Sequence, residues 1–349
     1  MTIDDRTRLV VPFILRIVVF SAFAGAAYGY FASASAGAAV YGVERGLLTG
    51  AVIGGVLTSL NIFVLDAPIR RGGVRRAPFL LHVALKSLIY LVVFLFGTWV
   101  GYRLVPGSGV VAFEIGLRDL LYFIALSFLV SFVLDLNRLL GQNVLLNFVS
   151  GRYFQPRVEQ RILLMIDMRN STAVAERLGE VDFHRLLNRF VGDLTGPIVI
   201  FKGQIHKYVG DELIVTWPLA VGLKNARCLR ACFGAIGRLA ELGPFYQREF
   251  GLSVDLRAAL HCGPVVIGEM GTIKREIALI GDTMNTTARI VDACRDSGEL
   301  IIASAALLRQ LTIPPGADAR PLGPIPLRGK KSPVELFALK AAGALSPAE

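Results

Sequence analysis

Residues 204–217 read Gln-Ile-His-Lys-Tyr-Val-Gly-Asp-Glu-Leu-Ile-Val-Thr-Trp and give the clearest indication of the architecture of the carboxyl-terminal half. Two runs that contain β-branched and aromatic residues flank the pair Gly210-Asp211, which suits a tight two-residue turn. The stretch therefore predicts a β-hairpin with strands at 204–209 and 212–217.

The segments on either side of the hairpin alternate between strand-like and helix-like patterns. A strand Ile162–Met168 and a helix Ala173–Phe190 are expected before it. The elements expected after it are, in order, a long helix Leu219–Phe250, a strand Val254–His261, a short strand near Val265, a strand Glu276–Ile280, a helix Thr283–Cys294 and a strand Leu300–Ala303. This order predicts an α+β sandwich of the ferredoxin-like, βαββαβ kind.

The amino-terminal half is much more apolar. Of the 349 residues, 54% are hydrophobic and only 18% are charged, which excludes a disordered chain and is too apolar for a wholly soluble one. Three stretches are long enough to cross a bilayer as helices, namely Leu9–Ala32, Gly46–Leu65 and Phe79–Tyr102, and Leu120–Leu134 can be extended to a fourth. We therefore expect an α-helical membrane domain of four transmembrane helices.

The positions of the arginines indicate how these helices are oriented. The chain has 37 basic and 27 acidic residues, a net charge of +10, and four arginines lie in the segment Arg70–Arg76 between the second and third apolar stretches. Arginine-rich loops stay on the cytosolic side. We predict a multi-pass protein of the inner (plasma) membrane, in contact with membrane lipid, whose amino terminus and whole chain after Leu140 are cytoplasmic. The basic residues are better explained by the orientation of the helices in the membrane than by binding to a nucleic acid. No nucleic-acid partner is therefore expected.

The sequence composition changes after the last apolar stretch, and this change suggests the domain boundaries. Apolar residues recur at helical spacing from Leu139 to Val149, which predicts an amphipathic helix that could also pair with its copy in a second chain. The predicted organisation is a transmembrane domain at 1–138, a coupling helix and linker at 139–157, and the α+β domain at 158–341. The four cysteines match no disulfide or zinc pattern and are expected to be free thiols.

Two aspartates of the α+β domain stand at positions where metal ligands are common. Asp167 ends the first expected strand, and Asn170-Ser171-Thr172 follow at a helix start, where free backbone N–H groups can receive phosphate oxygens. Asp211 lies in the hairpin turn. If the first strand lies beside the hairpin, the two carboxylates meet at one edge of the sheet and form a suitable site for Mg²⁺ bridging to a triphosphate. Each aspartate could instead be an ordinary helix cap or turn residue.

Four stretches of sequence favour the metal-ligand interpretation over the helix-cap or turn interpretation. They are, in chain order, Ile166-Asp-Met-Arg-Asn-Ser-Thr172, Lys207-Tyr-Val-Gly-Asp-Glu212, Arg257-Ala-Ala-Leu-His-Cys-Gly263 and Ile280-Gly-Asp-Thr-Met-Asn-Thr-Thr-Ala-Arg289. Together they resemble the motifs of the class III nucleotidyl cyclases, and the resemblance extends over about residues 152–339. It implies the catalytic domain of an adenylate cyclase, a phosphorus–oxygen lyase that converts ATP to 3′,5′-cyclic AMP and pyrophosphate.

The resemblance also implies roles for single residues. Asp167 and Asp211 match the ligands of two metal ions, Mg²⁺ or Mn²⁺. Asn285 and Arg289 match the pair that orients the ribose and stabilises charge on the α-phosphate, and Lys207 matches the lysine that reads the adenine ring. Basic residues near the carboxyl end, Arg328 and Lys330, match a stretch that binds the β- and γ-phosphates. For Arg257 a phosphate-binding and a structural role are equally open.

The sequence departs from the family at the nucleobase site. Adenylyl members usually carry Asp or Thr three residues before the glycine that corresponds to Gly281, whereas this chain has Ala278. Lys207 nevertheless favours ATP over GTP, because guanylyl members usually have an acid at that position. The resemblance further implies a homodimer with two sites, each built from residues of both chains. The expected role is signal transduction through cyclic AMP. A guanylate cyclase, or a catalytically silent membrane receptor with a cyclase-like signalling domain, is the alternative.

Overall fold

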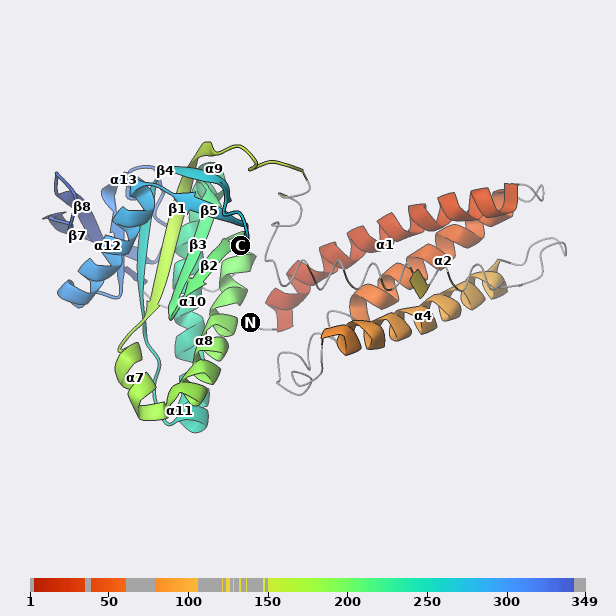
Figure 1. Cartoon of the computed structure of the whole chain (residues 1–349), viewed down its shortest axis with the longest axis horizontal. Coiled ribbons are helices and arrows are strands. Elements are labelled where there is room, and N and C mark those ends of the chain that lie inside the picture. Colours follow the sequence, from red (N-terminus) through yellow and green to blue (C-terminus); the bar gives the residue numbers. More distant parts are fainter. Residues whose placement is uncertain are drawn as a thin grey trace. The chain divides into compact units, whose positions relative to one another are not determined.

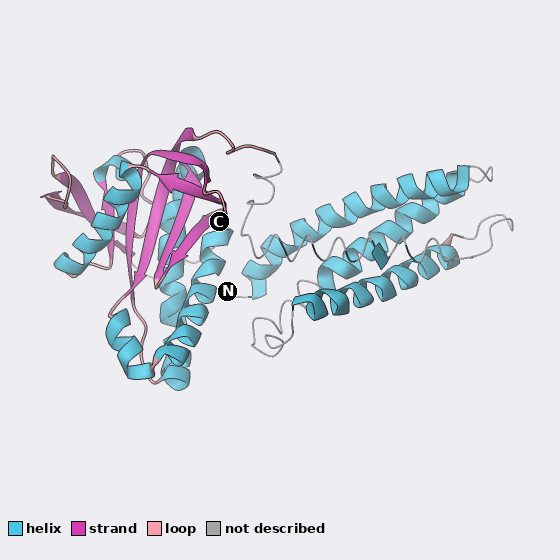
Figure 2. Cartoon of the chain, in the orientation of Figure 1, coloured by secondary structure: helices cyan, strands magenta, loops and turns pink. Residues whose placement is uncertain are grey.

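The computed structural model describes residues 3–34, 39–60, 79–105 and 150–341, together with a few single positions between 121 and 147. The chain divides into two compact units, Thr2–Leu139 and Leu140–Glu349. The first is helical, and the second combines helices with a sheet (Figure 2).

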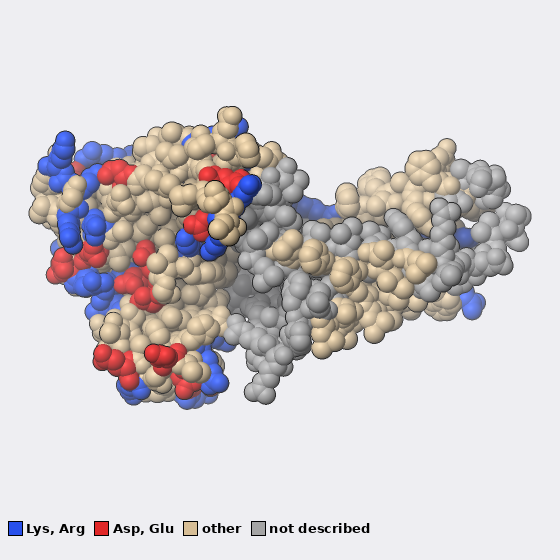
Figure 3. Space-filling model, in the orientation of Figure 1, with Lys and Arg blue, Asp and Glu red and all other residues tan. Residues whose placement is uncertain are grey.

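The described part of the helical unit contains three helices that are long and apolar enough to cross a membrane. They are α1 (Ile3–Ala34), α2 (Ala39–Ser59) and α4 (Phe79–Leu104), drawn from red to orange in Figure 1. On the face shown in Figure 3, charged side chains gather on the other unit and are scarce on these helices. Three of the four predicted spans are therefore confirmed as apolar helices.

One predicted helix of this unit begins at a different residue, and two other predicted segments are not described well enough to be compared. Helix α2 begins at Ala39 rather than Gly46, so Glu44 and Arg45 belong to the helix. The fourth predicted span, Leu120–Leu134, is described only at single positions, and the predicted amphipathic helix from Leu139 to Val149 only at Asn147, so neither prediction is tested.

Helices α1 and α2 pack through glycines. A Cβ atom on Gly25 would overlap the carbonyl oxygen of Gly46, and one on Gly46 would overlap that of Gly25. Gly29 and Gly42 are related in the same reciprocal way. Apolar side chains gain nothing from leaving lipid, so membrane helices associate through close backbone contact, which only small residues permit. The Gly/Ala/Ser-rich sequence of this half thus explains how the two helices fit together.

The α/β unit is built on one sheet. Its strands are β1 (Arg157–Met168), β2 (Gln204–Val209), β3 (Glu212–Pro218), β4 (Leu256–Met270), β5 (Glu276–Ile280), β6 (Ile301–Ser304), β7 (Ala317–Ile325) and β8 (Val334–Ala341). The strand order is β2-β3-β1-β4-β6-β8-β7, and β5 pairs with β4. The four neighbours β2, β3, β1 and β4 pair antiparallel, which is the ferredoxin-like arrangement. The predicted βαββαβ core is confirmed, and the hairpin strand 204–209 is found with the predicted bounds.

Two of the helices predicted for this unit are divided, whereas the one predicted over 283–294 is slightly longer, at 282–297. The helices are α7 (Ser171–Leu178), α8 (Glu180–Ile200), α9 (Leu219–Leu223), a 3₁₀ turn (Lys224–Ala226), α10 (Arg227–Glu241), α11 (Gly243–Phe250), α12 (Asp282–Ser297) and α13 (Ala305–Leu308). The single helix predicted over 173–190 is wrong, because Gly179, at φ 76°, separates α7 from α8. The single helix predicted over 219–250 is also wrong, since the chain turns at Asn225 and Ala226, whose φ angles are 54° and 50°. The two strands predicted near 254–265 are one continuous strand, β4.

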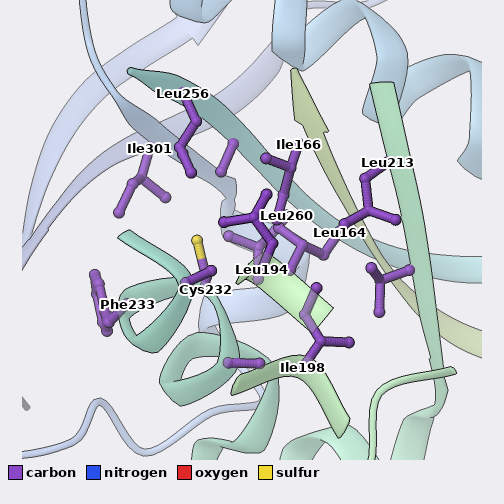
Figure 4. Packing of buried hydrophobic residues seen from close by; sticks show 14 of the residues in the cluster. Leu164, Ile166, Leu194, Ile198, Leu213, Cys232, Phe233, Leu256, Leu260 and Ile301 are labelled. Atoms are coloured by element: carbon purple, nitrogen blue, oxygen red, sulfur yellow. The ribbon is translucent and has the colours of Figure 1, made fainter. Parts of the chain in front are cut away.

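One face of the sheet carries the main apolar core. Alternate residues of β1, including Leu164 and Ile166, pack against Leu194 and Ile198 of α8 and against α10 (Figure 4). On the opposite face Met165 and neighbours pack against α12. Burial of each large aliphatic side chain contributes about 1.5–3 kcal/mol, so these two layers hold the sheet between helices.

The four cysteines are buried and unpaired, as predicted. Burial raises the pKa of the Cys228 and Cys294 thiols to about 12. A thiol that stays protonated is a poor nucleophile and a poor metal ligand. The cysteines therefore act as small apolar core residues.

Candidate active site

The site begins with the alternation of side chains along β1. Ile162, Leu164 and Ile166 are fully buried in the core, so Asp167, the next residue, belongs to the opposite face. Its direct neighbour across the sheet is Arg257 of β4. The Arg257 Nη1 atom lies 3.6 Å from Asp167 Oδ2, and Arg295 near the end of α12 approaches the same oxygen to 3.9 Å.

Asp211 completes a pair of carboxylates at this edge. It lies in the turn of the β2–β3 hairpin, after Gly210 at φ 61°, a left-handed conformation that glycine tolerates. Burial, the charge of Asp211 and hydrogen bonding with Asp211 raise the pKa of Asp167 to about 6, although the charges of Arg257 and Arg295 oppose that shift. The structure thus brings together the two predicted metal ligands, and the two nearby arginines do not fully offset the effects of burial and of the second carboxylate.

A third carboxylate, which the sequence analysis did not identify, lies beside them. Burial, followed by the charges of Asp167 and Asp211, raises the pKa of Glu212. Its Oε1 atom is buried and has no hydrogen-bond partner among the described residues. A buried polar atom without a partner is costly, and a cation at this edge would relieve it.

These residues fit a magnesium or manganese site that the protein completes only in part. Carboxylate oxygens are the ligands that both ions prefer. Within the described residues no group of three or more Asp, Glu, His or Cys side chains has the geometry to hold a metal by itself. Mg²⁺ commonly binds through one or two carboxylates together with substrate phosphates and water, which is the arrangement that Asp167 and Asp211 allow.

The start of α7 offers backbone donors near Asp167 in sequence. Asn170 precedes the helix in a left-handed conformation, at φ 55°, and its side chain makes no capping hydrogen bond. The first amide groups of the helix, at Ser171 and Thr172, have no intrahelical acceptor by the geometry of a helix start. The predicted phosphate-binding segment is therefore a true helix amino terminus.

Lys207 lies on the exposed strand β2 and contacts an acid that the sequence analysis did not single out. Its Nζ atom donates to both carboxylate oxygens of Glu276 on β5, at 3.1 and 3.3 Å. The hydrogen bond and charge of Lys207 lower the pKa of Glu276. Ala278, two residues further along β5, is buried.

Helix α12 carries the predicted pair Asn285 and Arg289, which are four residues apart and so share one face. Thr283 anchors the helix start, because its Oγ1 atom donates to the Pro264 carbonyl at 2.7 Å. Asn285 is exposed. Arg289 pairs with Asp292 of its own helix at 3.3 Å.

The two predicted basic residues near the carboxyl end flank a turn at Gly329, whose φ is 80°. Arg328 is exposed, and Lys330 Nζ lies 2.5 Å from Asp282 at the start of α12. His261 lies nearby, and burial and the charge of Lys330 lower its pKa to about 4. His261 is neutral, and its Nδ1 atom shares a hydrogen bond of 2.7 Å with Ser304.

The predicted residues therefore form two groups within one chain. Asp167 and Asp211 lie together with Arg257 and Arg295. The predicted substrate-binding and catalytic cations pair with other acids, namely Lys207 with Glu276, Arg289 with Asp292 and Lys330 with Asp282. Glu212 ends one of the four quoted stretches but was given no role, and no motif included Glu276 or Arg295. Alternation along β5, which puts Glu276 on the same side as Ala278, is the one signal that could have identified Glu276.

Comparison with known proteins agrees with this geometry. The family described as "Adenylate and Guanylate cyclase catalytic domain" matches residues 155–341. "Adenylate cyclase 2" of Rhizobium meliloti is 36% identical over 230 residues, which are 66% of this chain and 63% of that protein. "Adenylate cyclase" of Anabaena cylindrica is 25% identical over 188 residues, 51% of this chain and 36% of that protein. The chain thus spans less than two thirds of the length of both relatives.

A solved structure shares the fold. A bacterial light-regulated adenylyl cyclase superposes with a TM-score of 0.55 at 18% identity, over 67% of this chain and 68% of that one. At this identity the likeness concerns the fold alone.

Proposed function

We propose that this chain, which belongs to the family of adenylate and guanylate cyclase catalytic domains, is an adenylate cyclase that converts ATP to 3′,5′-cyclic AMP and pyrophosphate. The observation that carries the proposal is the contact between Asp167 and Asp211 at one edge of the sheet. The name of the relative in Rhizobium meliloti supports ATP as the substrate.

Asp167 and Asp211 would hold two divalent ions, Mg²⁺ or Mn²⁺. When bound, such ions lower the pKa of the ribose 3′-hydroxyl and neutralise charge on the leaving pyrophosphate. The 3′-oxygen would attack the α-phosphorus while the hydroxyl proton passes to water, and the bond from that phosphorus to the bridging oxygen would break as pyrophosphate leaves with the electron pair. The backbone amides after Asn170 would receive phosphate oxygens at the helix start.

The remaining residues position the nucleotide. Asn285 would hold the ribose, and Arg289 would donate to the α-phosphate oxygens as negative charge grows on them. Arg328 and Lys330 would bind the β- and γ-phosphates, for which a guanidinium fork is well suited. Lys207 would donate to the nucleobase.

A homodimer would bring these groups to one nucleotide. Within one chain Arg289 pairs with Asp292 rather than with Asp167, which supports a site shared between two chains. An exposed apolar row also favours a partner, since Val158, Val266 and Ile280 adjoin one another across β1, β4 and β5. Their exposed fractions are 69%, 38% and 55%, and a second copy of this surface would cover them.

The three apolar helices support a membrane-bound enzyme with the predicted organisation, a transmembrane domain at 1–138, a linker at 139–157 and a catalytic domain at 158–341. The arginine-rich segment at 70–76 favours an amino terminus and a catalytic domain on the cytoplasmic side of the plasma membrane. ATP is available on that side.

A product assay tests the proposal. Purified full-length protein in lipid nanodiscs is incubated with ATP or GTP and with Mg²⁺ or Mn²⁺, and the products are identified by mass spectrometry. Cyclic AMP from ATP is expected, and the Asp211→Ala variant is the matched control. Cyclic GMP as the main product would show a guanylate cyclase instead. Absence of both cyclic nucleotides from folded protein would favour the silent receptor.

A further inference from the structure

The contact between Lys207 and Glu276 is not explained by stability. The two side chains are 48% and 35% exposed, and an ion pair so accessible to water contributes little to folding. The contact nevertheless joins two different strands, β2 and β5, 69 residues apart in sequence. Its position gives it another use, because Lys207 is the residue to which the proposed function assigns the nucleobase.

The position of Glu276 on β5 is well defined. Side chains alternate along a strand, so Glu276, Ala278 and Ile280 share one side. Ile277 and Leu279 belong to the other side, where they pack against a buried cluster that includes Tyr153. Ala278 has no polar atom in its side chain. On this side of β5 Glu276 therefore supplies the carboxylate that lies beside Lys207.

The two side chains together present unused hydrogen-bonding groups. An ammonium has three donors, of which Lys207 directs two at Glu276, so one donor is left. A carboxylate has about four acceptor positions, and Lys207 occupies only two of them. A free donor and free acceptors thus lie within one hydrogen-bond length of each other.

We propose that Glu276 selects the nucleobase by accepting a hydrogen bond from the exocyclic amino group of adenine, while Lys207 donates to the adjacent ring nitrogen. This inference rests on the proposed function, because it assumes that a nucleotide binds beside Lys207. The edge of adenine offers an acceptor next to an amino donor, which matches the pair. Guanine carries a carbonyl oxygen in place of the amino group and an N–H in place of the ring acceptor. At the same position both contacts would be mismatched, and a site that hydrogen-bonds one base discriminates against a base that cannot make the same bonds.

A substrate analogue separates base reading from mere support of Lys207. Purine riboside triphosphate is an analogue of ATP that lacks only the exocyclic amino group. Values of kcat/KM for the two nucleotides are measured on full-length wild type, Glu276→Ala and Glu276→Gln, and calorimetric affinities are measured in parallel. Wild type should prefer ATP about 10- to 100-fold, the range for a hydrogen bond to a charged group.

Glu276→Ala should lose this preference, because turnover of ATP falls while turnover of the analogue stays nearly unchanged. Glu276→Gln keeps a neutral acceptor and should retain part of the preference. Glu269→Ala is the matched control, since Glu269 pairs with Arg275 at 3.0 Å in the same β4–β5 hairpin. That variant should keep the wild-type ratio.

Other outcomes overturn the inference. If Glu276→Ala lowers kcat/KM equally for both nucleotides, Glu276 only positions Lys207. If wild type does not distinguish the two nucleotides, the amino group is read elsewhere or not at all. Should wild type form no cyclic product, the proposed function fails, and the ratio of the two calorimetric affinities still decides whether Glu276 reads the base.

Discussion

The two parts of the candidate site differ in their charges: one brings like charges together, and the other pairs opposite charges. At the end of β1, Asp167 lies with Asp211 and Glu212, and this crowding of like charges raises the pKa of Asp167 and Glu212. On β2 and β5, Lys207 and Glu276 have opposite charges, and their contact lowers the pKa of Glu276. The acidic group is incomplete without a cation, whereas the opposite charges of Lys207 and Glu276 neutralise each other in the free protein.

This difference indicates different tasks. Carboxylates held together against their repulsion form a site that gains most from a divalent cation, which is what metal-assisted phosphoryl transfer requires. An exposed ion pair contributes little energy but fixes the direction of a donor and an acceptor. In this view the acidic group supplies rate and the Lys207–Glu276 pair supplies selectivity.

The largest expected effect comes from removing one acid. Asp167→Ala or Asp211→Ala should reduce formation of cyclic AMP to below about a hundredth of wild type, because neutral water cannot replace a metal-binding carboxylate. Asp318→Ala, an exposed acid on β7, is the control and should remain active. Initial rates at saturating Mg²⁺ measure the effect. Activity within tenfold of wild type in either variant would remove the metal assignment.

The next prediction tests whether the two groups serve one nucleotide from different chains. Asp211→Ala is co-expressed with the double variant Asn285→Ala/Arg289→Ala, each inactive alone. In a mixed dimer one interface combines both defects, and the other combines intact aspartates with an intact Asn285 and Arg289. Random pairing makes about half of the dimers mixed, with one working site of two, so activity should recover to about a quarter of wild type.

Co-expression of Asp211→Ala with Asp167→Ala is the matched control. Both changes damage the same group, so every interface keeps a defect and no recovery is expected. Differently tagged chains establish that mixed dimers form. If the first mixture stays inactive although its mixed dimers are present, one chain must build the whole site.

Local patterns predicted the parts of the fold that local chemistry determines. The bounds of β2 and β5 were predicted to the residue, because alternation and the Gly210-Asp211 turn define them. The break at Asn225 and Ala226 was not predicted, although Asn225 was a usable signal, because asparagine is one of the few residues that adopt left-handed angles. The left-handed angle at Ala226 carries no such signal and depends on the packing of the unit.

The site shows the same limit. The meeting of Asp167 and Asp211 followed from strand ends and the hairpin, so it could be predicted. The contact of Lys207 with Glu276 needs the approach of β2 to β5, two strands that do not pair with each other. A helix-capping or motif rule cannot supply such a contact, and only the assembled sheet does.

The smallest expected effect is on thermal stability, and it tests the cost of crowding. The pKa of Asp167 is raised to about 6 from an ordinary 3.8, so the folded state binds this proton more tightly than the unfolded state. Stability from this group is then fully present at pH below 3.8 and is lost as pH rises through about 6. Asp167→Asn removes the charge and should melt about 2–6 °C above wild type at pH 7.5 without divalent ions. The difference should shrink towards pH 4.

Trp217 provides the signal, since it is fully buried in the α/β unit, and a Trp99→Phe background removes the other tryptophan of the chain. Addition of Mg²⁺ at pH 7.5 should raise the melting temperature of wild type, because a ligand that binds only the folded state stabilises it, and should raise that of Asp167→Asn much less. If the Asn variant melts below wild type at pH 7.5, or if the difference is the same at pH 4 and pH 7.5, like-charge crowding does not govern this edge of the sheet. In that case Arg257 and Arg295 would already neutralise Asp167, and the contrast between the acidic group and the Lys207–Glu276 pair would disappear.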